Sequence, residues 1–234
     1  RGTLNLIQIM EKYNCLKLVF SSSASIYGLT DSKLINETAE INPIHPYANT
    51  KAVIETFLND LFYNNKNWSI VSLRYFNPIG AHPSGLIGEC CKGEPTNIFP
   101  LILKAASCKE REFKIFGNDW NTFDGTGVRD YIHVLDVAEA HYAAFDYIEN
   151  NSPQIISLNI GTGKGTSVLQ LIETFKKVNK CNVKFSYAPK REGDISSLIA
   201  DNGLSIKKLN WMPKENLEKM CEDGWRYYLQ NENE

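Results

Sequence analysis

Two kinds of apolar pattern alternate along the chain, short continuous runs and apolar residues at helical spacing. A continuous apolar run predicts a buried strand at 16–20, and further strands are predicted at 69–75, 130–134, 155–159 and 183–187. Helical spacing predicts helices over 2–13, 47–64, 97–108, 137–148, 168–178 and 214–230. The first strand, the helix at 47–64 and the strand at 69–75 follow one another with a long crossover. This order is that of a parallel βαβ unit.

The amino-acid composition of the chain changes after the second of these strands. From 77 to about 130 it is rich in Gly, Pro and Asn around a single predicted helix, which indicates a second lobe. The segments near 130–160 then return to the strand and helix pattern. We therefore expect an α/β fold of two interleaved lobes, with the boundary near residue 77.

The first predicted helix starts at the first residues of the chain. Arg1 and Gly2 lead into Leu4, Leu6 and Ile7 with no capping residue before them. We expect from this that an amino-terminal part of the fold is missing from the 234 residues.

Composition narrows the class of protein. With 25 basic and 27 acidic residues, the charge gives no reason to expect nucleic acid or an anionic membrane as a partner. The longest apolar stretch, 98–103, is too short to span a bilayer. The six cysteines form no CxxC pair and the four histidines supply no zinc spacing, so we expect no metal site. Free thiols are typical of a reducing compartment, which favours a cytoplasmic protein.

The helix predicted at 47–64 carries the first candidate chemistry. Tyr47 and Lys51 stand four residues apart, so their side chains project from one face, one turn apart. A lysine ammonium beside a phenol stabilises the phenolate and lowers its pKa from about 10. Such a tyrosine can act as a general base toward a hydroxyl group. By itself, a Tyr-x-x-x-Lys pair is also typical of a solvated helix face.

Residues around this pair add to the picture. The buried face of the same helix is predicted to hold Ala48, Ala52 and Leu58, with either Ile54 or Glu55 between them. Three serines at 21–23 end the preceding strand, where open α/β sheets place residues that handle ligands. A serine run in that place is otherwise a turn or a helix cap.

Six segments together resemble the UDP-galactose 4-epimerases, which are extended short-chain dehydrogenase/reductase proteins. They are FSSSASIYG at 20–28, PYANTK at 46–51, RYFNPIGAHPSG at 74–85, IFGND at 115–119, DGTGVRDYIHV at 124–134 and REGD at 191–194. The segments follow the family's order over essentially the whole chain. The resemblance implies a Rossmann-type parallel sheet without its amino-terminal part, and a smaller, interleaved mixed α/β lobe for the substrate.

Roles at the matching positions are implied by the same resemblance, with NAD as cofactor and a UDP-sugar as substrate. Tyr47 would be the catalytic base, Lys51 would lower its pKa and bind the nicotinamide ribose, and Ser23 would lie between Tyr47 and the sugar hydroxyl. Phe76 would pack near the nicotinamide. The UDP-sugar would be lined by Asn77, Asn97, Phe116, Arg129, Arg191 and Asp194. Leu198 would face the C2 substituent of the sugar.

The implied reaction is epimerisation at C4 of UDP-glucose and UDP-galactose. Hydride leaves C4 for NAD while Tyr47 takes the hydroxyl proton, the 4-keto sugar turns over, and hydride returns to its other face. Residues 1–77 would be the remaining part of an NAD-binding Rossmann domain, and 78–234 mainly the UDP-sugar-binding lobe, apart from the segments near 130–160. Helices 2–13 and 47–64 would pair with those of a second copy in a homodimer.

One segment departs from the family pattern. The Gly-rich turn that binds the NAD pyrophosphate does not occur in these residues, so we expect the 234 residues to be catalytically incomplete by themselves. GTGKGT at 161–166 looks like a substitute, but its third glycine comes one position early. A tight strand-to-helix connection is the better interpretation of this segment.

Three alternatives remain open from the sequence. Nucleotide-sugar dehydratases and decarboxylases share the tyrosine and lysine pair. Dehydratases of this kind carry a Thr-Asp-Glu run where this chain has Ser23, Ala24 and Ser25, so no carboxylate is available there for an elimination. An inactive fragment that only binds ligands or dimerises is the third possibility, and the retention of Ser23, Tyr47 and Lys51 disfavours it.

Overall fold

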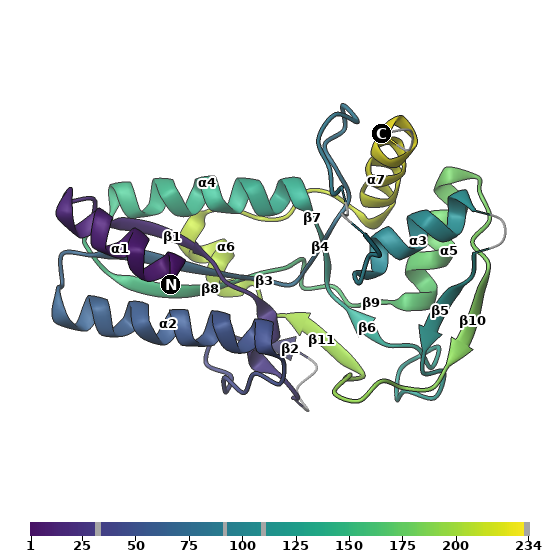
Figure 1. Cartoon of the computed structure of the whole chain (residues 1–234), viewed down its shortest axis with the longest axis horizontal. Coiled ribbons are helices and arrows are strands. Elements are labelled where there is room, and N and C mark those ends of the chain that lie inside the picture. Colours follow the sequence, from purple (N-terminus) through teal and green to yellow (C-terminus); the bar gives the residue numbers. More distant parts are fainter. Residues whose placement is uncertain (31–33, 91–92, 109–110, 232–234) are drawn as a thin grey trace.

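The first lobe is built on a three-stranded parallel sheet in the order β1-β3-β8. A computed structural model shows it and describes residues 1–30, 34–90, 93–108 and 111–231. The strands are β1 (Lys17–Ser21), β3 (Ser69–Tyr75) and β8 (Ile155–Ile160). Helices α1 (Gly2–Lys12) and α2 (Pro46–Asn64) lie on one side of the sheet, and α4 (Val134–Asn150) lies on the other (Figure 1).

Alternate residues of the central strand β3 serve the two faces, as a pleated strand requires. Ile70 packs with Ile7 of α1 and Leu58 of α2. Val71 packs in a separate cluster with Ala140 and Ala144 of α4. Because both faces are covered, β3 is buried over nearly its whole length. This explains why the apolar residues Ile70 and Val71 are adjacent in β3 and do not simply alternate with polar ones.

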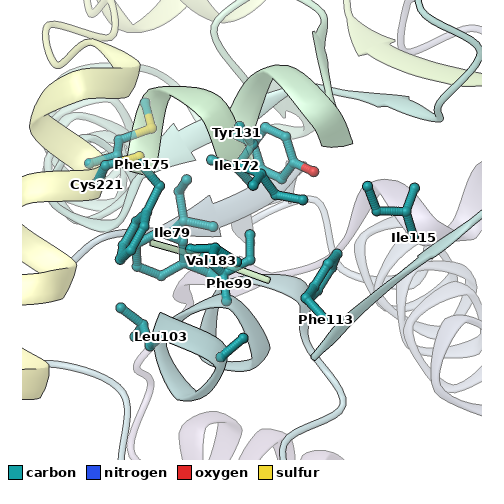
Figure 2. Close-up of a cluster of buried hydrophobic side chains, with 14 residues drawn as sticks. Ile79, Phe99, Leu103, Phe113, Ile115, Tyr131, Ile172, Phe175, Val183 and Cys221 are labelled. Carbon is teal, nitrogen blue, oxygen red and sulfur yellow. The ribbon is translucent and has the colours of Figure 1, made fainter. Parts of the chain in front are cut away.

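The second lobe holds its own core (Figure 2). Its elements are α3 (Ile98–Ser107), β5 (Phe113–Phe116), α5 (Val168–Asn179), β10 (Phe185–Ala188) and α7 (Leu217–Asn231). Phe99 meets Phe175 edge to face at 6.0 Å between ring centroids. A Cβ at Gly224 would collide with the Phe99 ring, so α7 needs a glycine at this point to approach α3 closely.

Short strands join the two lobes. They are β2 (Leu34–Ile35), β4 (Asn77–Ile79), β6 (Val128–Arg129), β7 (Tyr131–His133), β9 (Thr166–Ser167) and β11 (Ser197–Ala200). The buried Asp130 carboxylate lies where they meet: it accepts hydrogen bonds from the backbone N–H groups of Thr162 at 2.8 Å and Ala200 at 3.2 Å. A further bond comes from Gly163 N–H at 2.9 Å. One carboxylate therefore holds the β8–β9 loop and β11 to the chain between β6 and β7.

The α/β class predicted from the sequence is confirmed, and the predicted strands and helices occur within a few residues of their expected ends. The segment 161–166 is the tight connection that was expected, because Gly161 lies against the Asp130 carboxylate and leaves no room for a Cβ. The sequence did not predict α6 (Gly203–Leu209), which packs against α4 and β8 and returns a further segment to the first lobe. Throughout the described ranges, no helix combines the length and apolar character needed to cross a membrane.

Candidate active site

A cleft between the lobes holds two connected compartments. The larger has a volume of about 640 Å³ and the smaller of about 200 Å³. Both are lined by Asn77, Asn97 and Arg129, which mark the junction between them. The larger compartment lies beyond the carboxyl ends of β1 and β3, where open α/β sheets bind ligands.

Tyr47 lies in the first turn of α2 and lines the larger compartment. Pro46 occupies the first helical position, where its missing N–H costs no hydrogen bond, so the helix begins just before the tyrosine. Lys51 follows one turn later, with Nζ 5.5 Å from the centroid of the Tyr47 ring. Its ammonium donates a hydrogen bond to the Ser21 carbonyl oxygen at 2.7 Å. Burial lowers the pKa of Lys51, and the tie to the end of β1 fixes its charge beside the phenol.

Ser23 lines the same compartment just beyond the end of β1. Its Oγ accepts a hydrogen bond from the Ser25 backbone N–H at 3.2 Å and lies 2.9 Å from Ser25 Oγ. Ser23 is thereby the N-cap of the short helix η1 (Ala24–Tyr27). The cap and the place in the compartment go together, because the cap holds the hydroxyl of Ser23 at the compartment wall.

Tyr75, which the sequence reasoning did not single out, is a second phenol in the larger compartment. Burial raises the pKa of Tyr75 and the neighbouring Tyr47 raises it further, while a hydrogen bond with Ser21 opposes the rise. Ser21 Oγ in turn lies 2.8 Å from His141 Nε2 of α4. The position of Tyr75 directly before Phe76 in the segment 74–85 was a signal for it.

Phe76 and Leu198 contribute apolar walls to the larger compartment. Phe76 is buried in a cluster with Ala24 and Ala52, and Leu198 packs against that cluster from β11. In the register of β11 and β6, Leu198 pairs with Arg129. Leu198 therefore lies in the larger compartment, close to its junction with the smaller one.

The smaller compartment is lined by the groups predicted to hold the nucleotide, Phe116, Arg191 and Asp194. The Arg191 guanidinium lies 4.5 Å from the centroid of the Phe116 ring. Its Nε donates to Asp194 Oδ2 at 2.9 Å. An aromatic face, a guanidinium and a carboxylate thus lie together, and these groups suit a base, a phosphate and ribose hydroxyls respectively.

Three predicted residues lie at the junction. Arg129 donates from Nη1 to the carbonyl oxygens of Val128 at 2.8 Å and Ile195 at 3.0 Å, and burial lowers its pKa. Asn97 donates from Nδ2 to Glu89 Oε1 at 3.3 Å. Asn77 begins β4, where its backbone N–H donates to the Asp130 carbonyl oxygen at 3.0 Å. Among the described residues, the hydrogen bonds of the Arg129 guanidinium go to main-chain carbonyl groups, so its positive charge remains available to an anion.

The structure brings all predicted site residues to this cleft except Lys51, which lies behind Tyr47 and reaches the end of β1. The sequence reasoning missed several other lining residues, among them Thr96, Trp120 and Tyr131. Trp120 carried no motif signal, and it reaches the cleft by donating from Nε1 to the Phe116 carbonyl oxygen at 3.1 Å. Tyr131 is the second residue after Arg129 in the segment 124–134, and this spacing was a signal for it.

Among curated proteins, the chain is similar to UDP-glucose 4-epimerases. It is 44% identical to that of Bacillus subtilis over 232 residues, covering 99% of this chain and 68% of the relative. It is 43% identical to that of Drosophila melanogaster over 236 residues, covering 99% and 67%. The chain thus spans about two thirds of the length of these relatives.

Solved structures agree with the sequence comparison. A UDP-glucose-4-epimerase from Stenotrophomonas maltophila with bound NAD and formylated UDP-arabinopyranose matches with a TM-score of 0.96 at 42% identity, covering 99% of this chain and 69% of that one. The UDP-Glc/GlcNAc 4-epimerase of Campylobacter jejuni matches with a TM-score of 0.78 at 37% identity, covering 97% and 69%. The model of the NAD dependent epimerase/dehydratase family matches residues 1–161. Since that match covers more than half of the chain, and the relatives match nearly all of it, the chain belongs to this family.

Proposed function

We propose that the protein interconverts UDP-glucose and UDP-galactose by NAD-dependent epimerisation at C4. One observation carries the proposal: Tyr47, with Lys51 behind it, and Ser23 line a compartment that shares the walls Asn77, Asn97 and Arg129 with the compartment of Phe116, Arg191 and Asp194. A base for a sugar hydroxyl and groups suited to a nucleotide therefore share one cleft. The names of the relatives, UDP-glucose 4-epimerases at 40–44% identity, support the same reaction.

Lys51 and the residues of the larger compartment beside Tyr47 fit the nicotinamide end of NAD. The Lys51 ammonium has three donors and uses one on the Ser21 carbonyl, so two remain for ribose hydroxyls. Phe76 and Ser23 provide an apolar wall and a hydroxyl beside Tyr47. When bound, NAD supplies the acceptor and later the donor of the C4 hydride.

Tyr47 is proposed as the group that takes and returns the proton of the C4 hydroxyl. Tyr47 is 54% exposed and lines the cleft, so its phenol can reach a ligand there. Lys51 stabilises the phenolate by its fixed positive charge. Ser23 at the same wall is placed to share the hydrogen bond between the phenol and the sugar hydroxyl. Loss of this proton together with the C4 hydride, for which NAD would be the acceptor, would leave a keto group at C4.

The two compartments divide the work on the substrate. Arg129, Arg191 and Phe116 hold the UDP, because guanidinium groups pair with phosphate oxygens and an aromatic face accepts a base. The larger compartment, at about 640 Å³, leaves the keto sugar room to turn and present its other face. Tyr47 then returns the proton to the C4 oxygen of the inverted sugar.

The test is the interconversion of UDP-galactose and UDP-glucose by the full gene product with NAD, followed by coupled assay. Tyr47→Phe should lower kcat by about 10²–10⁴-fold, the usual contribution of a general base. Tyr63→Phe, on an exposed tyrosine of the same helix, is the matched control and should keep the wild-type rate. Activity of Tyr47→Phe within twofold of wild type would remove Tyr47 from this role. Release of a keto sugar with loss of water would identify the dehydratase alternative instead.

We also infer a cytoplasmic homodimer that works without nucleic acid or membrane. The described cysteines Cys15, Cys90, Cys108, Cys181 and Cys221 are free, which suits a reducing compartment, and Cys91 lies outside the described residues. The net charge of −2 gives nucleic acid no electrostatic attraction. Apolar side chains on α1 and α2 remain exposed, which supports pairing with a second copy.

A further inference from the structure

A buried ion pair lies directly behind the proposed catalytic residues. Arg74 of β3 and Glu55 of α2 are 5% and 2% exposed. Arg74 Nη2 donates to Glu55 Oε2 at 2.5 Å, and Arg74 Nε donates to both carboxylate oxygens at 3.0 and 3.1 Å. The pair is thus bidentate and lies between the helix and the sheet.

The remaining polar atoms of the pair are also engaged. Ser22 Oγ donates to Glu55 Oε1 at 2.5 Å. Arg74 Nη1 donates to the Tyr27 hydroxyl at 3.0 Å and to the Glu37 carbonyl oxygen at 3.1 Å. Burial acts to lower the pKa of Arg74, but hydrogen bonds and charge from Glu55 and Tyr27 outweigh it and raise that pKa above its ordinary value. Arg74 is therefore a permanent cation inside the protein.

Stability does not explain such a pair. Taking two charges out of water costs several kcal/mol for each ion, and apolar residues of similar volume are often as stabilising or more so. What a bidentate pair adds is direction, because its two parallel hydrogen bonds exist at one relative placement of helix and strand. The pair is therefore best suited to fixing where α2 lies on the sheet.

The placement that it fixes is that of the catalytic groups. Tyr47, Lys51 and Glu55 follow one another at intervals of four residues, so they form one row along α2. At the other end of the network, Ser22 directly precedes Ser23. Glu55 thus bonds to the neighbour of one proposed catalytic residue and shares a helix row with the other.

We propose that Glu55, held by Arg74 and Ser22, is a positioning residue that keeps the Tyr47 phenol at working distance from Ser23 and the bound hydroxyl. This inference rests on the function proposed above. It predicts a loss in kcat and little change in KM. The groups proposed to bind UDP lie on other segments: Phe116 on β5, Arg129 on β6, and Arg191 just after β10.

The test replaces both charges together, so that no unpaired ion is left behind. In Glu55→Met with Arg74→Met we expect a folded protein whose kcat is lower by about 10–100-fold, because misplacement by about 1 Å can cost a factor of 10². KM for the UDP-sugar should stay within about threefold. Glu149→Gln breaks the exposed pair of Lys17 and Glu149, at the opposite end of β1, and serves as the control with an unchanged rate.

A thermodynamic cycle separates positioning from a general effect. Added to Tyr47→Phe, the double change should cost less than about threefold, because the group that it places is already gone. Equal losses in the two backgrounds overturn the proposal. Where the double variant fails to fold, Ser22→Ala carries the same cycle with a smaller change and an expected loss of about 2–10-fold.

A crystal structure of the folded variant adds a readout that needs no activity. We expect the Tyr47 phenol to be displaced relative to Ser23, and a phenol at its wild-type position overturns the proposal. A kcat within twofold of wild type overturns it as well. The wild-type assay alone decides the proposed function, so a protein without interconversion activity refutes that function, while the crystal structure still tests the positioning.

Discussion

Several contacts together fix the position of the charged Lys51 ammonium group. Its Nζ donates to the Ser21 carbonyl oxygen and lies 5.2 Å from the Phe20 ring centroid and 5.5 Å from that of Tyr47. A lysine with four rotatable bonds would ordinarily sample many positions. Here the strand end holds the head group, so its charge acts on the phenol at a nearly constant distance.

Replacement of Lys51 should therefore change the pH dependence as well as the rate. In Lys51→Met the phenol loses its cationic neighbour, so the phenolate that takes the proton is less stable. We expect the acid limb of the kcat–pH profile to move to higher pH and the maximal rate to fall. Lys51→Arg, which keeps a positive charge, should retain more of the activity near neutrality. An unchanged profile in Lys51→Met would show that the lysine is only structural.

Leu198 is expected to set the range of sugars. Leu198 lines the larger compartment, and its side chain is intermediate in size between a small residue and a large aromatic one. An N-acetyl group would therefore have to displace part of the leucine. Overpacking of this kind costs about 1–3 kcal/mol. We expect kcat/KM to favour UDP-glucose and UDP-galactose over the UDP-N-acetylhexosamines. Leu198→Ser should raise the activity on the acetylated pair and barely change the other. Equal ratios of kcat/KM before and after the change would exclude Leu198 as the gate.

At the scale of elements, the sequence identifies what local patterning controls. β3 and α2 are predicted to within a residue of their ends. Each has an apolar pattern that is complete within its own residues, so no distant contact is needed to recognise it. The short strands β4, β6, β9 and β11 are not predicted. They exist because distant segments pair across the lobes and because the Asp130 carboxylate accepts hydrogen bonds from N–H groups of the β8–β9 loop and of β11. Such elements have two to four residues and carry no period of their own.

The approach of α7 to α3 gives a prediction for stability. Alanine in place of a mid-helix glycine gains about 1 kcal/mol in helix propensity. At Gly224, however, the new Cβ would collide with Phe99, which is fixed edge to face on Phe175. Overpacking costs about 1–3 kcal/mol, so Gly224→Ala should lower the free energy of unfolding despite the gain in propensity. Gly2→Ala, where a Cβ meets no atom within 4 Å, is the control for urea unfolding. A more stable Gly224→Ala protein would show that Phe99 can move aside.

At the scale of the whole molecule, the site combines residues that lie far apart in the chain. Motif spacing placed Tyr47 and Lys51 on one helix face, and the structure confirms that geometry. Motif spacing could not show that Leu198 and Ser23 line one compartment, since this depends on how the lobes pack. The sequence left open whether Ile54 or Glu55 is the buried residue, for a related reason. The structure buries Glu55, and the buried Arg74 that pairs with it explains why a carboxylate lies there.

The exposed apolar face of α1 and α2 predicts the assembly. Leu6, Ile9 and Val53 are 50%, 56% and 59% exposed, which is costly for a monomer in water. We expect the full gene product to be a dimer by light scattering at micromolar concentration. Leu6→Glu with Val53→Glu should yield a folded monomer, because like charges would meet across the interface. Met212→Glu, at an exposed apolar position after α6, is the control and should stay dimeric. A wild-type monomer under these conditions would refute the assembly.

The division of the cleft into two joined compartments has a consequence for inhibitors and for evolution. A small molecule that fills only the smaller compartment, which Phe116 and Arg191 line, would compete equally with every UDP-sugar that the protein accepts. A molecule that enters the wide part would instead be selective for particular sugars, since Leu198 and Phe76 shape that wall. Mutations in the larger compartment can likewise change the range of sugars that the protein accepts without lowering its affinity for the nucleotide. Recognition and chemistry can therefore drift independently within one molecule.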